Sequence, residues 1–244
     1  MKKLIIAVFA FLPAFAFASG AGVKLDQANY DLSDQASLQN GAKLFMNYCA
    51  GCHSTQYQRY NRVAEDLGIP EDIMQANLNF TGVAVGELME NSIPEKDAAS
   101  WFGAPPPDLT LVARVRGADW LYTYLRSFYK DDSRPFGVNN LVFPSVGMPH
   151  VLEPLQGSAT LKTVTHTVDG KEVTTPVGVE ASGNGELTTE EYDNAVLDIV
   201  NFLVYSGDPV KLERHRMGYW VLGFLVIFFI FAYMLKKEYW RDVH

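Results

Sequence analysis

The sequence predicts a mainly α-helical domain that carries one small β-hairpin and is followed by a single transmembrane helix. Two segments show helical hydrophobic periodicity, and an uncharged run of 19 residues lies near the C-terminus. Residues 160–177 alternate polar and β-branched side chains around Asp169-Gly170, which is typical of a β-hairpin. With 48% hydrophobic and 20% charged residues, the composition indicates a globular domain rather than a disordered chain.

The first predicted helix runs from Leu32 to Tyr48. Its apolar residues recur at steps of three and four, and Asp31 or Ser33 is placed to cap its start. Gly41 lies in its middle, where glycine costs about 1 kcal/mol relative to alanine. We therefore expect another helix to cross at Gly41, since a missing side chain lets two backbones come close.

The last predicted helix of the domain has clear signals at both ends. Thr188-Thr189-Glu190-Glu191 fits a capping box at its start. Gly207 and Pro209 stop the helix. Its apolar residues mark one face, which we expect to be buried: Tyr192, Ala195, Val196, Ile199, Val200 and Leu203.

The chain between these helices is rich in glycine and proline. Residues 54–104 predict short helices and loops, and the proline run at 104–107 predicts stiff extended chain. Asp108 is placed to cap a helix that starts at the next residue. A further apolar helix is expected at 120–129, followed by a loop at 131–155.

Two apolar segments at the ends of the chain are set apart from the domain. Residues 1–18 combine a basic start, a short apolar run and a small-residue cleavage site, as in a cleaved signal peptide. Residues 217–235 would span about 28 Å as a helix, close to the thickness of a bilayer core. We therefore expect a domain at 19–210, a linker at 211–216, the anchor at 217–235 and a tail at 236–244.

The orientation follows from the signal peptide, because three basic residues on each side of the span leave the positive-inside rule undecided. An exported domain lies on the periplasmic side of the inner (cytoplasmic) membrane, with the C-terminus in the cytoplasm. Residues 19–210 hold 12 basic and 25 acidic residues, a net charge of −13. Such a surface argues against nucleic acid as a partner. It suits a basic protein partner, and solubility alone explains it equally well.

The chemistry of the chain centres on Cys49-Ala50-Gly51-Cys52-His53. This spacing is the attachment pattern of c-type haem, in which two thiols bond the vinyl groups and the histidine binds the iron. A thioredoxin-like redox pair would need a preceding strand and gives the histidine no role. Half of a zinc site would need a second cysteine pair, which the sequence lacks. We expect one covalent haem c and no structural disulfide.

An electron-transfer haem pairs histidine with a methionine, whose soft thioether favours Fe(II). The candidates downstream of the motif are Met74, Met89 and Met148. Met148 is favoured because Gly147 and Pro149 hold its backbone in a fixed loop. The alternatives left open are that Met148 only fills core and that His150 is the ligand.

The two haem propionates need charged or hydrogen-bonding partners where they are buried. Arg114 and Arg116 follow the proline run, and Arg126 is a weaker candidate. Each of the three also fits a solvated basic residue, and the residues alone do not separate Arg114 from Arg116.

Together these motifs resemble the cytochrome c1 family, the haem subunits of the cytochrome bc1 complex (ubiquinol–cytochrome c reductase). Four features carry the resemblance in the family's order. They are the haem motif after Gly41-x-x-x-Phe45, then Pro106-Pro107-Asp108-Leu109 with Arg114-x-Arg116, then Phe143-Pro144 through Met148-Pro149, and one C-terminal span. Some members carry an extra disulfide, for which this chain has no cysteine.

The resemblance implies a class I cytochrome c-like fold with His53 and Met148 as the axial metal ligands. It also implies that Arg116 meets a propionate and that Pro107 lines the haem pocket. The first helix would cross the last one, with Gly41 and Phe45 packed near Phe202 and Tyr205. Its partners would be cytochrome b, the Rieske iron–sulfur protein, the membrane, and a soluble or anchored cytochrome c.

The function expected from these features is one-electron transfer from the Rieske protein to a cytochrome c. The chain would catalyse no reaction alone and would act as the electron-transfer subunit of a ubiquinol–cytochrome c oxidoreductase. One alternative is an anchored cytochrome that donates to a terminal oxidase, which an uncleaved segment 1–18 would favour. Another is an open-site haem sensor or peroxidase, which would bind ligands at the iron. A structural metal module without haem is the third.

Overall fold

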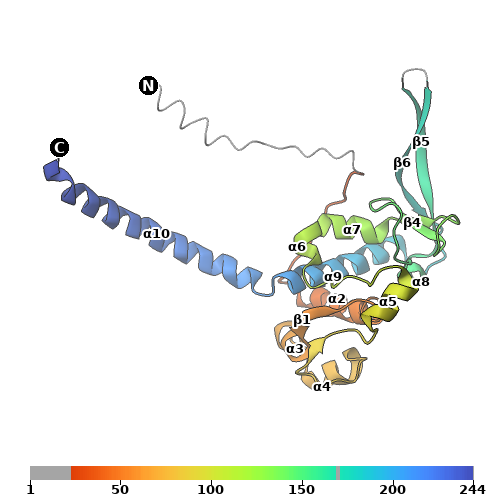
Figure 1. Ribbon diagram of the computed structural model, residues 1–244, viewed down its shortest axis with the longest axis horizontal. Helices are drawn as coiled ribbons and strands as arrows, with labels where there is room; N and C mark the ends of the chain where they lie inside the picture. Colours follow the sequence, from red (N-terminus) through yellow and green to blue (C-terminus); the bar gives the residue numbers. More distant parts are fainter. Residues whose placement is uncertain (1–22, 169–170, 244) are drawn as a thin grey trace.

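The computed structural model describes residues 23–168 and 171–243, and it shows a helical domain from which a β-hairpin and one long helix project (Figure 1). The predicted mainly helical fold with one small hairpin and an apolar C-terminal helix is confirmed. The predicted signal peptide lies outside the described residues. The larger helices are α2 (Gln35–Tyr48), α3 (Tyr60–Leu67), α5 (Glu95–Phe102), α7 (Ala118–Arg126), α9 (Thr189–Gly207) and α10 (Lys211–Tyr239).

The crossing of α2 and α9 forms the centre of the domain, with α6 (Val112–Arg116) and α7 packed against α9 (Figure 1). A Cβ atom added at Gly41 would lie 2.0 Å from the carbonyl oxygen of Asp198, so only glycine fits between these backbones. The rings of Phe45 and Phe202 pack beside it, with centroids 5.3 Å apart. The predicted helix crossing at Gly41 is confirmed.

Polar side chains at the same crossing pair the two helices. Asp198 accepts hydrogen bonds from Ser37 Oγ at 2.5 Å and from Asn40 Nδ2 at 2.7 Å. Asn201 donates to the carbonyl oxygen of Asp31 at 2.7 Å. These directional bonds join specific positions of the two helices, so they help to fix the register of the crossing.

The helix caps agree with the sequence at α9 and differ at α2. Thr188 and Glu191 form the complete capping box that was predicted. The cap of α2 is Asp34, whose carboxylate accepts from the backbone N–H of Ser37. The prediction of Asp31 or Ser33 was wrong because Asp31 instead accepts the backbone N–H and the hydroxyl of Ser33, in a local turn before the helix.

The strands in the described part of the chain form three antiparallel pairs. The predicted hairpin is confirmed as β5 (Ala159–Val168) and β6 (Lys171–Ala181), and its Asp169-Gly170 turn lies outside the described residues. The pairs β1 (Thr55–Arg59) with β2 (Leu88–Met89) and β3 (Phe128–Lys130) with β4 (Val138–Asn140) were not predicted. Such short strands show no alternation in sequence, and they exist because their partners are brought alongside. Short helical segments complete the chain: α4 (Glu71–Ile73), η1 (Met74–Leu78), α8 (Glu153–Gln156) and η2 (Arg241–Val243).

The chain around the proline run also departs from prediction. Helix α6 begins at Val112 with Leu111 as its N-cap residue, so Asp108 does not cap it. Helix α7 ends at Arg126 rather than Tyr129, because the residues from Phe128 pair with β4.

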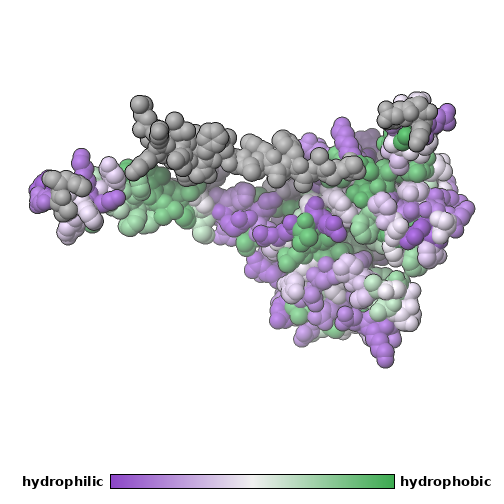
Figure 2. Space-filling view, turned by 45° about the horizontal axis from the view of Figure 1, so that its top comes forward, coloured by the Kyte–Doolittle hydropathy of each residue, from purple (hydrophilic) through white to green (hydrophobic). Residues whose placement is uncertain are grey.

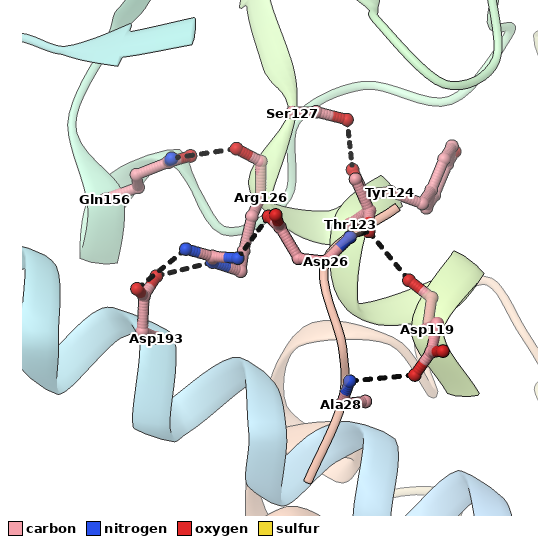
Figure 3. A network of polar contacts seen from close by, with 9 residues as sticks. All are labelled: Asp26, Ala28, Asp119, Thr123, Tyr124, Arg126, Ser127, Gln156 and Asp193. Atoms are coloured by element: carbon pink, nitrogen blue, oxygen red, sulfur yellow. Dashed lines mark hydrogen bonds and ion pairs between the residues drawn. The ribbon is translucent and has the colours of Figure 1, made fainter. Parts of the chain in front are cut away.

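An ion-pair network fastens the N-terminal segment to the helices (Figure 3). Arg126 pairs with Asp193 of α9 through two hydrogen bonds of 2.5 and 2.7 Å, and with Asp26 at 2.7 Å. The backbone N–H of Asp26 donates to Thr123, and that of Ala28 donates to Asp119. The segment is thereby held along α7.

Helix α10 stands away from the domain, and none of its residues is buried (Figure 1). Its hydrophobic band lies between hydrophilic ends (Figure 2). Its 29 residues are long and apolar enough to cross a membrane. The helix includes residues 211–216, which directly precede the uncharged run.

Gly41→Ala should destabilise the domain by about 3 kcal/mol, because the added methyl group forces two packed backbones apart. The free energy of unfolding in denaturant measures this. Gly86→Ala is the matched control, since a Cβ atom there meets nothing within 4 Å. A Gly41→Ala stability equal to that of the control would contradict the crossing.

Candidate haem-binding site

The Cys-x-x-Cys-His motif forms a tight turn at the C-terminal end of α2. The carbonyl oxygen of Cys49 accepts from the backbone N–H of Cys52 at 3.0 Å and of His53 at 2.9 Å. Residues three and four apart in such a turn face the same way, so both thiols and the imidazole are presented together. Both cysteines are free thiols, Cys49 buried and Cys52 half-buried.

Burial, together with a smaller contribution from the neighbouring Cys52, raises the pKa of the Cys49 thiol to about 12. Redox-active and metal-binding cysteines have lowered pKa values, because the thiolate is their reactive form. The environment of Cys49 is therefore unlike that of a thioredoxin-type pair.

The orientation of His53 is set by a backbone acceptor. Its Nδ1 lies 2.7 Å from the carbonyl oxygen of Pro107, so Nδ1 carries the proton and donates it. The other ring nitrogen, Nε2, is then the atom with a lone pair for a metal. Burial lowers the pKa of His53, although the Pro107 bond and Asp108 act in the opposite direction, so the ring is held in its neutral, ligating form.

The segment that carries Pro107 is tied to the motif by further bonds. Asp108 accepts from the backbone N–H of Gln56 at 2.8 Å and of Thr110 at 2.9 Å. Leu109 N–H donates to the carbonyl oxygen of Ser54. Asn91 donates to the carbonyl oxygen of Cys52 at 3.0 Å and to the hydroxyl of Ser54. The turn and its acceptor are thus one connected unit.

Met148 lies half-buried in the loop after β4, packed against the hydrophobic core. The hydroxyl of Tyr124 donates to its sulfur at 3.4 Å. The Trp120 ring stacks on Tyr124 with centroids 4.8 Å apart, which restrains the phenol. A thioether with one lone pair in a hydrogen bond keeps the other for a metal.

The other methionine candidates are more deeply buried. Met74 is 1% exposed in η1, and Met89 is 4% exposed in β2. Met89 and Met46 line a cavity of about 250 Å³ beside His53, together with Phe45 and Tyr60. Position alone therefore keeps Met89 as an alternative to Met148.

His150, the rival ligand from the sequence, is buried. Its ring stacks on Phe128, and its Nε2 lies 2.7 Å from the side-chain oxygen of Gln156. The Gln156 contact occupies Nε2, and together with the stacking on Phe128 it gives the residue a packing role.

The structure distinguishes the three arginines that the sequence left as candidates for a propionate partner. Arg114 contacts Asp208 at 3.8 Å and donates to the carbonyl oxygen of Gly207. Arg126 belongs to the ion-pair network that holds the N-terminal segment. The guanidinium of Arg116 lies over the rings of Trp120 (5.0 Å) and Phe143 (5.9 Å), beside the Met148 loop, and among the described residues no carboxylate lies within 4.0 Å of it.

The residues present fit a covalently attached haem. Two adjacent thiols, a neutral imidazole with Nε2 left for iron, a thioether with an oriented sulfur and an arginine for a propionate are the groups that such a cofactor requires. When bound, the cofactor would supply a one-electron redox centre.

Comparison with known proteins agrees with this geometry. The family model described as "Cytochrome C1 family" matches residues 27–243. The chain belongs to the cytochrome c1 family. Members of the family carry one covalently bound haem c and transfer electrons within a cytochrome bc1 complex, so electron transfer in such a complex is the function of this chain.

Individual relatives match most or all of the chain. A cytochrome c1 from Allochromatium vinosum is 56% identical over 246 residues, which span 100% of both chains. A protein named ammonia monooxygenase gamma subunit from Nitrosomonas europaea is 47% identical over 244 residues, 100% of this chain and 99% of the relative. A cytochrome c1 from Blastochloris viridis is 27% identical over 238 residues, 86% of this chain and 82% of the relative.

Sequence reasoning missed several residues of this cytochrome c1 site. Asn91 and Asp108 bond backbone groups far from them in sequence, and no pattern marks such bonds. Trp120 and Tyr124 stand four apart in a predicted apolar helix. Their spacing showed that they share a face, but it did not show that this face meets Met148.

Asp108→Ala should destabilise the domain by about 2–4 kcal/mol, because two backbone N–H groups lose a charged acceptor. Denaturant unfolding measures this. Asp132→Ala is the control, since the exposed Asp132 side chain makes no hydrogen bond among the described residues. Equal stability of the two variants would mean that Asp108 does not fasten the Pro107 segment.

Proposed function

We propose that this cytochrome c1 family member takes an electron from the Rieske iron–sulfur protein and passes it to a soluble or anchored cytochrome c. The observation that carries the proposal is the Cys49–His53 turn with Nδ1 of His53 bonded to Pro107 at 2.7 Å. This bond leaves a neutral imidazole nitrogen fixed for iron, which suits repeated one-electron cycles without ligand exchange.

Each site residue then has one role. Cys49 and Cys52 would hold the haem through thioether bonds, and His53 and Met148 would bind its iron. Pro107 orients the imidazole, and Arg116 meets a propionate because its guanidinium is not committed to a carboxylate of the described chain. The donor set makes an electron carrier rather than a catalyst, since both axial positions would be filled by protein.

The proposed location is the periplasmic face of the inner membrane, with α10 as a single anchor and the tail in the cytoplasm. The length and hydropathy of α10 support the anchor. The predicted signal peptide at 1–18 supports export of the domain. Cytochrome b is the proposed neighbour within the membrane. Donation to a terminal oxidase and an open-site sensor or peroxidase are the rival functions.

Met148→Leu should expose the iron. The wild-type complex should show a c-type reduced-minus-oxidised spectrum that carbon monoxide leaves unchanged. The variant should bind the gas, and its potential should fall by on the order of 0.1 V, within the range of about 0.8 V that axial ligands control. Visible spectra and a redox titration measure both effects.

Met89→Leu and Met74→Leu are the matched controls, because both residues are buried methionines of the same domain. If Met89→Leu bound carbon monoxide and Met148→Leu did not, the iron ligand would be Met89, in the cavity beside His53. Carbon monoxide binding by the wild type would show an open iron site, and it would favour a sensor or peroxidase function over electron transfer.

Tyr124→Phe should lower the potential by about 20–60 mV while both axial ligands remain. The O–H dipole points its positive end at the Met148 sulfur, which favours the less positive Fe(II) state. A net hydrogen bond of about 0.5–1.5 kcal/mol sets the magnitude, at 59 mV per tenfold change for one electron. Redox titration measures it, with Tyr122→Phe as the control; an unchanged potential would exclude a role for the hydroxyl.

A further inference from the structure

A second cavity lies where the domain meets α10, and its lining is basic. It has a volume of about 590 Å³ and lies between the N-terminal segment, α6, the start of α7 and the junction of α9 with α10. Four cations line it, against two carboxylates, in a domain whose net charge is −13. The cations are Arg114, Arg116, Lys211 and Arg214, and the carboxylates are Asp119 and Asp208.

In this cavity a carboxylate lies deep and two guanidinium groups lie nearer the solvent. Asp208 is only 13% exposed and contacts both Arg114 and Arg214, whereas the side chains of these arginines are 59% and 57% exposed. One carboxylate beneath two guanidiniums holds them in place and leaves N–H donors of both facing solvent. An approaching anion therefore meets the cations first.

Lys211 completes the basic rim from the first turn of α10. Its ammonium donates to the hydroxyl of Tyr30 at 2.6 Å and lies 4.8 Å from the centre of that ring. The tyrosine hydroxyl accepts this bond, so its own proton is left to donate. Leu25, Ala113 and Val204 add apolar surface to the same cavity.

The depth of the cavity relative to a bilayer points to its ligand. The 29 residues of α10 span about 43 Å, which matches a bilayer with its headgroups, whereas the uncharged run matches the hydrocarbon core alone. Arg214 and Lys211 precede that run by three and six residues, or about 4.5 and 9 Å along the axis. Both therefore lie in the headgroup layer of a bilayer whose hydrocarbon core the uncharged run spans.

We propose that this cavity binds the phosphate headgroup of an anionic phospholipid, with Lys211, Arg214, Arg114 and Tyr30 as its donors. Guanidinium groups pair with phosphate oxygens through two bonds, and the apolar lining accepts the first part of an acyl chain. The site rests on the proposed membrane crossing of α10 and not on the electron-transfer roles. Arg116, assigned above to a propionate, is not needed for it.

The test measures lipid binding to the purified, delipidated complex by native mass spectrometry, with phosphatidylglycerol as the probe. Lys211→Gln with Arg214→Gln should raise the apparent dissociation constant for phosphatidylglycerol at least tenfold. Lys96→Gln with Lys130→Gln is the matched control, because it removes the same charge from exposed positions outside the cavity, and it should stay within twofold of the wild type.

A charge-preserving variant covers the case in which the glutamine variant fails to assemble. Lys211→Arg with Arg214→Lys should bind phosphatidylglycerol within threefold of the wild type, whereas Arg214→Gln alone should already weaken binding. Unchanged affinity in the glutamine variants would overturn the site. Equal binding of phosphatidylcholine, or full displacement by millimolar inorganic phosphate, would overturn its assignment to an anionic lipid. Loss of all variants and the wild type from membranes on salt washing would instead contradict the anchor.

Discussion

The close approach of α2 and α9 at Gly41 is the constraint on which the other features of the structure depend. A backbone contact that tolerates no side chain fixes both the distance and the register of two helices. The haem motif directly continues α2, so its position is set by this crossing. The second helix of the crossing, α9, leads through Asp208 into α10. One contact therefore relates the haem motif to the apolar helix α10.

The proposed metal site is supported by residues outside the motif. The carbonyl oxygen of Pro107 fixes the ring of His53, and the hydroxyl of Tyr124 contacts the sulfur of Met148. Both partners are themselves held, Pro107 through its neighbour Asp108 and Tyr124 by stacking on Trp120. Such supporting contacts keep ligands in place while an electron enters and leaves, which limits the structural change that accompanies transfer.

Much of this architecture was predictable because it depends on residue patterns within short segments of the sequence. The capping box at Thr188, the β-hairpin and the interior Gly41 each have a physical reason to occur where they do. The motif itself predicted the cofactor, which family membership bears out, and Cys49 and Cys52 remain the proposed attachment residues. The resemblance to the cytochrome c1 family, carried by four ordered motifs, is confirmed by the family match over residues 27–243.

The features that escaped prediction depend on contacts between distant segments. Aspartate is a residue type that often caps helices. Asp108 instead accepts hydrogen bonds from the backbone N–H groups of Gln56 and Thr110, because the proline run brings it to β1. His150 is buried because Phe128 and Gln156 surround it, and neither is close to it in a recognisable pattern. Arg114 and Arg116 are the same residue type and differ only in their neighbours. Those neighbours cannot be predicted from two positions that stand two residues apart in the sequence.

The central claim is that the iron is held by His53 and Met148, and near-infrared magnetic circular dichroism of the oxidised complex tests it most directly. This spectroscopy distinguishes a histidine–methionine pair from two nitrogen ligands through the ligand-to-iron charge-transfer band. The account predicts the histidine–methionine band in the wild type and its loss in Met148→Leu. A band from two nitrogen ligands in the wild type would contradict the account and would turn attention to His150.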